Sequence, residues 1–225
     1  MTRAMATERK REFMKRSVSV MTGLALMASG VVAEPLKMGF EDGKVGEEPG
    51  GLFVIEGEFT VIESEGGKAI QIAAAPLVET GAILGESMKD MGGVVSVRVK
   101  ANKKRRSYPR FGVGLHGLSG YRLRAVPAAK QLELVKNEEV VKKVPLTWVA
   151  GQWTTIELSL LPDGEGWKVE GRVWGEGKER PEEADLELGD AVKPKSGKAS
   201  IWGTPYAWLP IIFDDVEARA VPAKN

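Results

Sequence analysis

The sequence predicts an all-β fold, an antiparallel sandwich of two β-sheets. Three observations lead to this prediction. Apolar and polar residues alternate along almost every segment, and turn signals such as Gly-Gly, Pro-Asp-Gly and Ser-Gly separate these segments at close spacing. No stretch beyond the N-terminal region keeps a helical period for three turns. Short strands that each bury one face are expected to pack as two sheets.

The expected strands follow one another along the chain. Alternation is clearest in 92–101, 110–117 and 120–126. Further runs with the same pattern are 52–62, 68–73, 130–135, 138–144, 152–160, 166–175, 198–203 and 211–220. The charged segment 178–197 is expected to form a long surface loop with at most one short strand.

The N-terminal residues 1–33 have the pattern of a secretory signal peptide. A basic stretch ends at Lys15-Arg16, an apolar run follows, and small residues precede Glu34. The alternative is an uncleaved membrane anchor. Cleavage after Ala33 would leave one domain, 34–225, secreted or periplasmic and without a membrane span. The chain has no cysteine, so packing, with or without a metal, must hold it together.

Charge excludes one class of partner. Without residues 1–33 the chain has 26 basic and 29 acidic residues, a net charge of about −3, which does not indicate a nucleic-acid partner. We expect a monomer.

A match to G-x-G-x-x-G occurs at 112–117. A dinucleotide site needs this motif between a strand and a helix, whereas here the glycines lie within one expected strand and a second strand follows. Gly112 and Gly114 are out of phase with the apolar residues, so they would leave an open trough in the backbone surface, with His116 beyond it.

Cationic residues surround this trough in the expected sheet. Arg110, His116, Arg122 and Arg124 are out of phase with the apolar residues of 110–117 and 120–126, and Arg98 with those of 92–101. If the three strands are neighbours, their arginines could pair bidentately with the carboxylate or sulfate of an anionic polysaccharide. The alternative is an ordinary solvated sheet face.

Aromatic residues divide by the same alternation. Trp153 and Trp167 are expected in the core, and Tyr121 and Trp174 are secondary candidates for stacking on a ligand. The loop aromatics Trp202, Tyr206 and Trp208 are expected either to stack on sugar rings or to fold over the sandwich edge.

Acidic residues occur at both ends of the expected domain. Glu41 and Asp42 lie in GFEDG, and the adjacent Asp214 and Asp215 interrupt the last strand, where one of them should point inward. If the first and last strands are neighbours, these four carboxylates repel one another unless a cation binds them. Oxygen ligands of this kind suit calcium.

A third acidic motif is EADLE, with Glu183, Asp185 and Glu187. On a strand these carboxylates would share a face, and the motif resembles the E-x-D-x-E signature of laminarinase-type glycosidases, although its charged surroundings favour a loop. An enzyme would use Glu183 and Glu187 as a hydrolase, or His116 and Tyr121 as a lyase.

The motifs FEDG, GQW and FDDV together resemble those of the concanavalin A-like jelly-roll superfamily. The pairing of FEDG with FDDV is similar to xylanase-associated carbohydrate-binding modules, in which the chain ends share a structural calcium ion. The resemblance implies a jelly roll that binds a polysaccharide or oligosaccharide. The alternatives are a glycan-active enzyme and a structural accessory domain without a glycan ligand.

Overall fold

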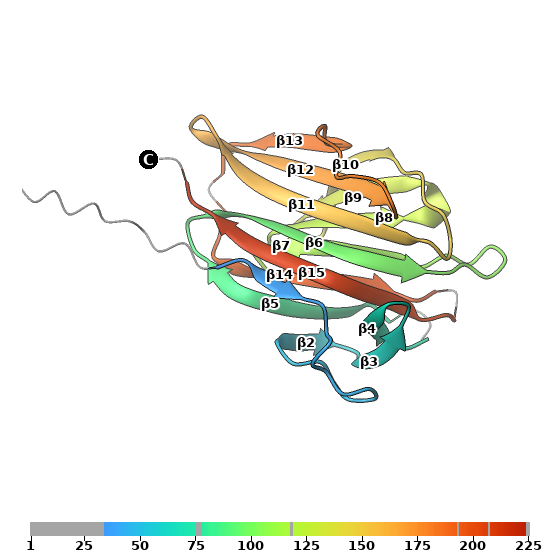
Figure 1. The fold of residues 1–225 in the computed structure, drawn as a ribbon. Coiled ribbons are helices and arrows are strands. Elements are labelled where there is room, and N and C mark those ends of the chain that lie inside the picture. The colour runs from blue at the N-terminus through green and yellow to red at the C-terminus, as the bar shows by residue number, and fades with distance from the viewer. Residues whose placement is uncertain (1–33, 75–77, 118, 193, 207, 224–225) are drawn as a thin grey trace, which may run out of the picture. The chain divides into compact units, whose positions relative to one another are not determined.

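Two antiparallel β-sheets pack face to face and confirm the predicted sandwich (Figure 1). The computed structural model describes residues 34–74, 78–117, 119–192, 194–206 and 208–223, so the predicted signal peptide lies outside the described residues. Within these ranges no helix has the length and apolarity of a membrane span. The one helical segment assigned there is a 3₁₀ turn, η1, at Pro127–Ala129.

Within the described residues the first sheet has eight strands. In spatial order they are β13 (Leu186–Asp190), β12 (Gly166–Gly175), β11 (Trp153–Asp163), β6 (Gly92–Ala101), β15 (Ile211–Val221), β4 (Gly67–Ile72) and β3 (Phe59–Ser64), and β1 (Leu36–Met38) also pairs with β15. The first and last strands are therefore neighbours, as expected, and Figure 1 shows β1 beside β15.

The second sheet has seven strands in the part of the chain that the structure describes. Their order is β10 (Glu139–Pro145), β9 (Gln131–Lys136), β8 (Tyr121–Val126), β7 (Arg110–Leu115), β14 (Gly197–Thr204), β5 (Thr80–Met88) and β2 (Leu52–Glu56). The run 52–62 was expected as one strand, but it changes sheet at Gly57, whose φ of 75° turns the chain between β2 and β3. β5 was not among the predicted strands.

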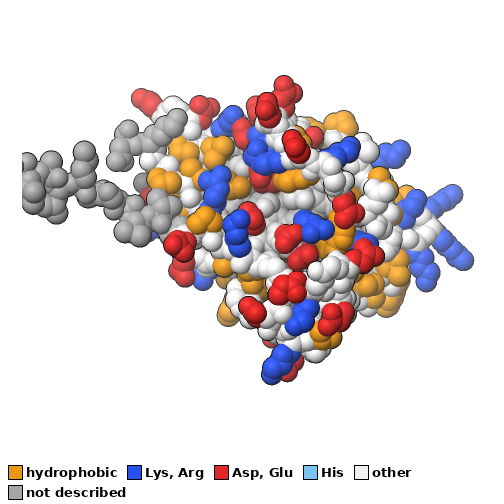
Figure 2. Space-filling model, viewed as in Figure 1, with side chains coloured by type: hydrophobic (Ala, Val, Ile, Leu, Met, Phe, Trp, Pro, Cys, Tyr) orange, Lys and Arg blue, Asp and Glu red, His pale blue; other side chains and the backbone are white. Residues whose placement is uncertain are grey.

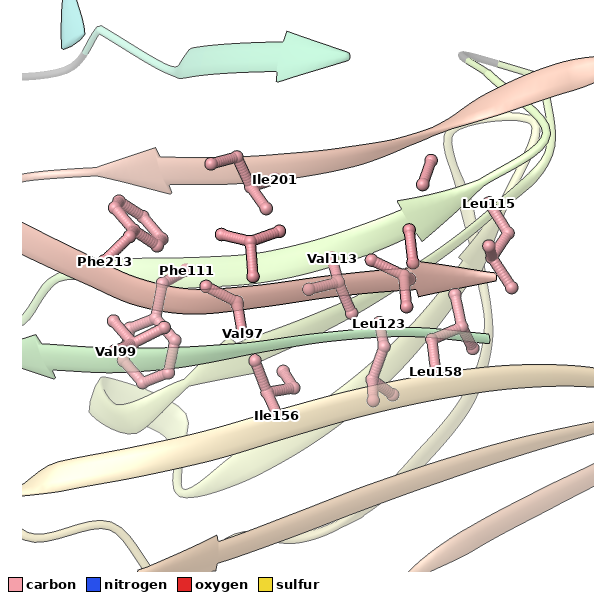
Figure 3. Packing of buried hydrophobic residues seen from close by; sticks show 14 of the residues in the cluster. Val97, Val99, Phe111, Val113, Leu115, Leu123, Ile156, Leu158, Ile201 and Phe213 are labelled. Carbon is pink, nitrogen blue, oxygen red and sulfur yellow. The ribbon is translucent and has the colours of Figure 1, made fainter. Parts of the chain in front are cut away.

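The core lies between the sheets and follows the predicted alternation. Figure 3 shows side chains of β6 and β11 packed against those of β7 and β8, among them Val97, Ile156, Val113 and Leu123, which are fully buried. In the charged segment 178–197, the short strand β13 is the one assigned strand before β14 begins at Gly197, as predicted. The alternation thus defines an outer face on each sheet, where candidate sites can lie.

Candidate functional site

The structure separates the predicted binding residues onto different surfaces. β7 and β8 are neighbours, as expected, so Arg110, Arg122 and Arg124 share the outer face of the seven-stranded sheet. The expectation that 92–101 adjoins them is wrong, because β6 lies in the other sheet between β11 and β15. Arg98 on β6 and Trp174 on β12 are therefore on the outer face of the eight-stranded sheet.

His116 follows β7 and is buried, with 2% of its surface exposed. Its φ is 63°, and neither imidazole nitrogen makes a hydrogen bond within the described residues. Burial lowers the pKa of His116, and this effect outweighs the backbone groups of Lys195 and Met88 that favour the charged form. The side chain is thus enclosed and neutral, and it does not face a ligand surface.

Tyr121 is buried on the core side of β8. Its hydroxyl donates a hydrogen bond to Asp190, which also pairs with Lys136, so these side chains connect β8 and β9 with β13 of the opposite sheet. Burial, together with the hydrogen bond to Asp190, raises the pKa of Tyr121 to about 12. The Tyr121 ring therefore packs between the sheets. The lyase pair of His116 and Tyr121 is buried and is not exposed to a substrate.

The predicted glycine trough is occupied by Trp202. This residue lies on β14 and not in a loop, and its ladder partners are Gly112 on β7 and Gly81 on β5. A Cβ at Gly81 would lie 2.2 Å from the indole ring, and one at Gly114 would lie 2.5 Å from the Oγ of Ser200, which accepts the indole N–H. The glycines therefore leave space for a flat, buried indole.

Two Arg–Glu pairs lie on this outer face. The guanidinium of Arg122 is 4.0 Å from the centre of the Trp202 ring and donates to both carboxylate oxygens of Glu79, at 3.1 and 3.0 Å. Arg124 donates through Nε and Nη2 to one oxygen of Glu133, at 3.2 and 2.7 Å. The exposed Arg110 lies 5.1 Å from the ring centre of Tyr206.

A groove of about 190 Å³ runs beside these pairs, lined by Glu79, Gly120, Arg122, Arg124, Val135 and Glu138. Sequence reasoning missed the acidic residues of the groove and also Glu133, the partner of Arg124. Glu133 could have been found, because it alternates with Leu132 and Leu134 and so must face outward beside Arg124. Glu79 comes just before β5, the strand that was not predicted.

The carboxylates of the last strand do not enter the core. A β-bulge lies between Asp214 and Glu217, and Asp215 has a φ of 44°. The extra residue lets Phe213 and Val216 both point inward, which leaves Asp214 and Asp215 outside. The expectation that one of them points inward is therefore wrong.

Arg98 neutralises this acidic pair. Its Nη1 is 2.7 Å from the carboxylate of Asp215 and 3.8 Å from that of Asp214. Partial burial raises the pKa of Asp214, and the charges of Asp215 and Glu41 act in the same direction. Glu41 is thus close enough to Asp214 to affect it, as the pairing of chain ends predicts.

A lysine occupies the other half of the predicted calcium site. The backbone N–H of Lys68 donates to the Glu41 carboxylate, and its Nζ donates to the carbonyls of Glu41 and Gly43 at 2.8 and 2.9 Å. Asp42 is exposed. Among the described residues no three His, Cys, Asp or Glu side chains gather to hold a metal ion. In this arrangement the residues do not fit the predicted calcium site, because Lys68 and Arg98 take its oxygen ligands.

The EADLE carboxylates do not share a strand face, in agreement with the loop that their charged surroundings favour. Glu183 and Asp185 precede β13, and Glu187 alone lies within it. Asp185 accepts a hydrogen bond from the backbone N–H of Val173 at 2.8 Å. The three residues therefore do not form the arrangement that a retaining glycosidase needs.

Two other carboxylates are buried nearby, on the outer face of the eight-stranded sheet. Arg180 pairs with Glu157 at 2.6 Å and Arg172 with Glu170 at 2.8 Å, while Arg172 also donates to carbonyls of the segment 176–185. Burial alone would raise the pKa of Glu170, but its bonds to Lys168 and Arg172 lower it. A general acid needs a raised pKa, and that of Glu170 is lowered. The network connects the segment 176–185 to the sheet.

No protein-family model matches the sequence, and no curated protein matches it. Solved structures are similar in fold. A Lotus tetragonolobus seed lectin aligns with a TM-score of 0.55 and 9% identity over 85% of this chain and 100% of the lectin. Arcelin-5, a lectin-like defence protein from Phaseolus vulgaris, gives 0.54 and 8% over 83% and 97%. Carbohydrate-binding module CBM66 from Bacillus subtilis gives 0.51 and 11% over 75% and 95%. The fold of this chain is therefore similar to that of these lectins and of the carbohydrate-binding module, a two-sheet β-sandwich.

Proposed function

We propose that this chain is a carbohydrate-binding, lectin-like domain and that it binds its ligand in the groove beside Arg122 and Arg124. The observation that carries the proposal is the groove itself, into which Arg122 and Arg124 project from β8 while Glu79 and Glu133 hold them in place. Two of the structural neighbours are described as a lectin and as a carbohydrate-binding module, which supports the same function.

The chemistry of a sugar suits this groove. Sugar hydroxyls donate and accept hydrogen bonds, and the groove offers guanidinium donors beside carboxylate acceptors. Because Glu79 and Glu133 already hold the two arginines in place, little side-chain entropy is lost when a ligand binds.

Within this proposal the preferred ligand is an anionic polysaccharide. Arg110, Arg122, Arg124 and Lys143 lie with Glu79, Glu133 and Glu138 on this surface, so one positive charge is left for a uronate or sulfate group. The leader-like residues 1–33 support a secreted or periplasmic location. A calcium ion is not part of the proposal, because Lys68 and Arg98 hold the ligands it would need.

Calorimetric titration tests the proposal with a neutral, a uronate and a sulfated tetrasaccharide, each at low and at moderate salt. We expect the two acidic sugars to bind more tightly, and more so at low salt. The double variant that carries both Arg122→Gln and Glu79→Gln should bind the uronate sugar about tenfold more weakly, or weaker still. Changing both partners avoids leaving an unpaired charge.

The matched control is Lys37→Gln with Glu217→Gln, an exposed ion pair between β1 and β15 that should not affect binding. Tighter binding of the neutral sugar would refute the anionic preference. Unchanged uronate binding in the groove variant would show that the ligand lies elsewhere.

A further inference from the structure

A second and larger hollow lies at the end of the sandwich where β7 begins and β8 ends. Its volume is about 610 Å³, within the range of small-ligand sites. Three connections form it: the loop 102–109 between β6 and β7, the η1 turn after β8, and the loop 146–152 between β10 and β11. The lining residues that matter to the argument are Lys103, Tyr108, Lys130, Leu146, Trp148 and Val149. We call this hollow the loop cleft.

The wall of the loop cleft is aromatic and anchored in the core. The Trp148 ring contacts that of Tyr108 edge-on, with centroids 6.5 Å apart, and that of the buried Phe111 at 6.1 Å. The backbone N–H of the buried Leu146 donates to the carbonyl of Lys130 at 2.9 Å, which ties two of the three connections together. The cleft is thus largely preformed.

Both charged side chains that line the loop cleft are lysines. The Nζ of Lys103 lies 5.3 Å from the ring centre of Tyr108 and 3.5 Å from its hydroxyl oxygen. Lys104, Arg105 and Arg106 follow on the same exposed loop, and Figure 2 shows basic side chains gathered at its tip. The cleft therefore attracts anions more strongly than the groove, whose arginines are partly neutralised by glutamates.

From this geometry we propose that the loop cleft binds an acidic sugar unit. The apolar face of the sugar ring stacks on Trp148 and Tyr108, and its carboxylate or sulfate pairs with Lys103 and Lys130. Ammonium groups only donate hydrogen bonds, so they match an anionic group that only accepts them. This inference rests on the proposed function and adds a second place of contact to it.

The loop cleft and the groove both lie along β8. Arg124 lines the groove, and Pro127, which lines the cleft, is three residues later, about 10 Å of extended chain. One acidic polymer of several units can therefore contact both, and two linked contacts strengthen each other's binding.

The experiment uses ¹⁵N-labelled protein secreted by cells that express the full chain. The indole N–H of Trp148 is buried and makes no hydrogen bond within the described residues, so its NMR signal is sensitive to a ligand in the cleft. We expect a uronate tetrasaccharide to shift this signal, assigned with Trp148→Phe. We also expect Lys103→Gln with Lys130→Gln to weaken uronate binding about tenfold. Both lysines are exposed, so the variant should fold.

The matched control changes two lysines that lie outside the cleft, Lys37→Gln with Lys178→Gln, and should bind as the wild type does. If the cleft variant binds with wild-type affinity and the Trp148 signal does not shift, the proposal that the loop cleft binds a sugar is overturned. The proposed function then stands if the Arg122 and Glu79 variant loses binding. Equal binding of the neutral tetrasaccharide in the cleft overturns the acidic preference. If no tetrasaccharide binds the wild-type protein, both proposals fail.

Discussion

At the scale of single residues, His116 was predicted to contact a ligand, but the fold buries it. Its left-handed backbone, with φ of 63°, turns the chain after β7 and places the imidazole in the protein interior. A histidine buried in this way is kept neutral, because burial disfavours the imidazolium ion. Its charge state is therefore linked to stability and not to ligand binding.

This linkage predicts a pH dependence of the free energy of unfolding. The native pKa of His116 lies below its ordinary value near 6.5, to which it returns in the unfolded chain. Above that value both states are neutral. As the pH falls through it, the unfolded state binds the proton first, so stability is lost by up to about 1.4 kcal/mol per pH unit until the native pKa is reached.

Urea unfolding between pH 8 and pH 5.5 measures this loss. His116→Asn is the suitable variant, because asparagine tolerates a positive φ and does not titrate. We expect the variant to lose less stability than the wild type over this range. Equal losses in the two proteins would mean that His116 takes up its proton in the native state.

At the scale of elements, the three adjacent strands β5, β14 and β7 depend on the fit between Trp202 and its glycine neighbours. The indole lies across the ladder where Gly81 and Gly112 are its partners. The sequence pattern placed both glycines of β7 on the outer face correctly, but it could not indicate that a tryptophan 90 residues after Gly112 would be its ladder partner and lie beside Gly114. That fact depends on strand order.

Gly81→Ala tests this fit. Its added Cβ would lie 2.2 Å from the Trp202 ring, so the indole and the Arg122 guanidinium stacked on it must move. We expect a loss of about 1–3 kcal/mol in the free energy of unfolding, measured by urea denaturation. Gly189→Ala on β13 is the control, because no atom lies within 4 Å of its added Cβ. Equal stability of the two variants would show that the indole has room to shift.

At the scale of the whole molecule, much of the fold follows from the sequence because side-chain alternation is a local property. The boundaries of β6 agree with the predicted run 92–101, and the pairing of β1 with β15 was expected. Sheet membership is not local: β6 and β7 are consecutive but lie in different sheets, and this separates Arg98 from Arg122. The strand order therefore places the predicted binding residues on two different sheets. The prediction that Arg98, Arg122 and Arg124 face outward was nevertheless correct.

At the junction of the chain ends, acidic side chains lie beside two protein cations. The sequence indicated correctly that acidic residues from both ends lie together, but not that Lys68 and Arg98 supply the positive charge there. Their partners lie on elements far apart in the chain: Lys68 on β4 contacts the segment after β1, and Arg98 on β6 contacts β15. Two protein cations thus join the segments that a calcium ion was expected to join.

We therefore expect Lys68→Met to lower the free energy of unfolding by about 1–2 kcal/mol, because it removes hydrogen bonds to the carbonyls of Glu41 and Gly43. Lys44→Met, which breaks only an exposed pair with Glu47, is the control and should change little. The wild-type melting temperature should be the same in calcium and in a chelator. A ligand that binds only the native state at a hundredfold excess over its Kd adds about 2.7 kcal/mol, so a clear rise in calcium would show that the metal displaces Lys68.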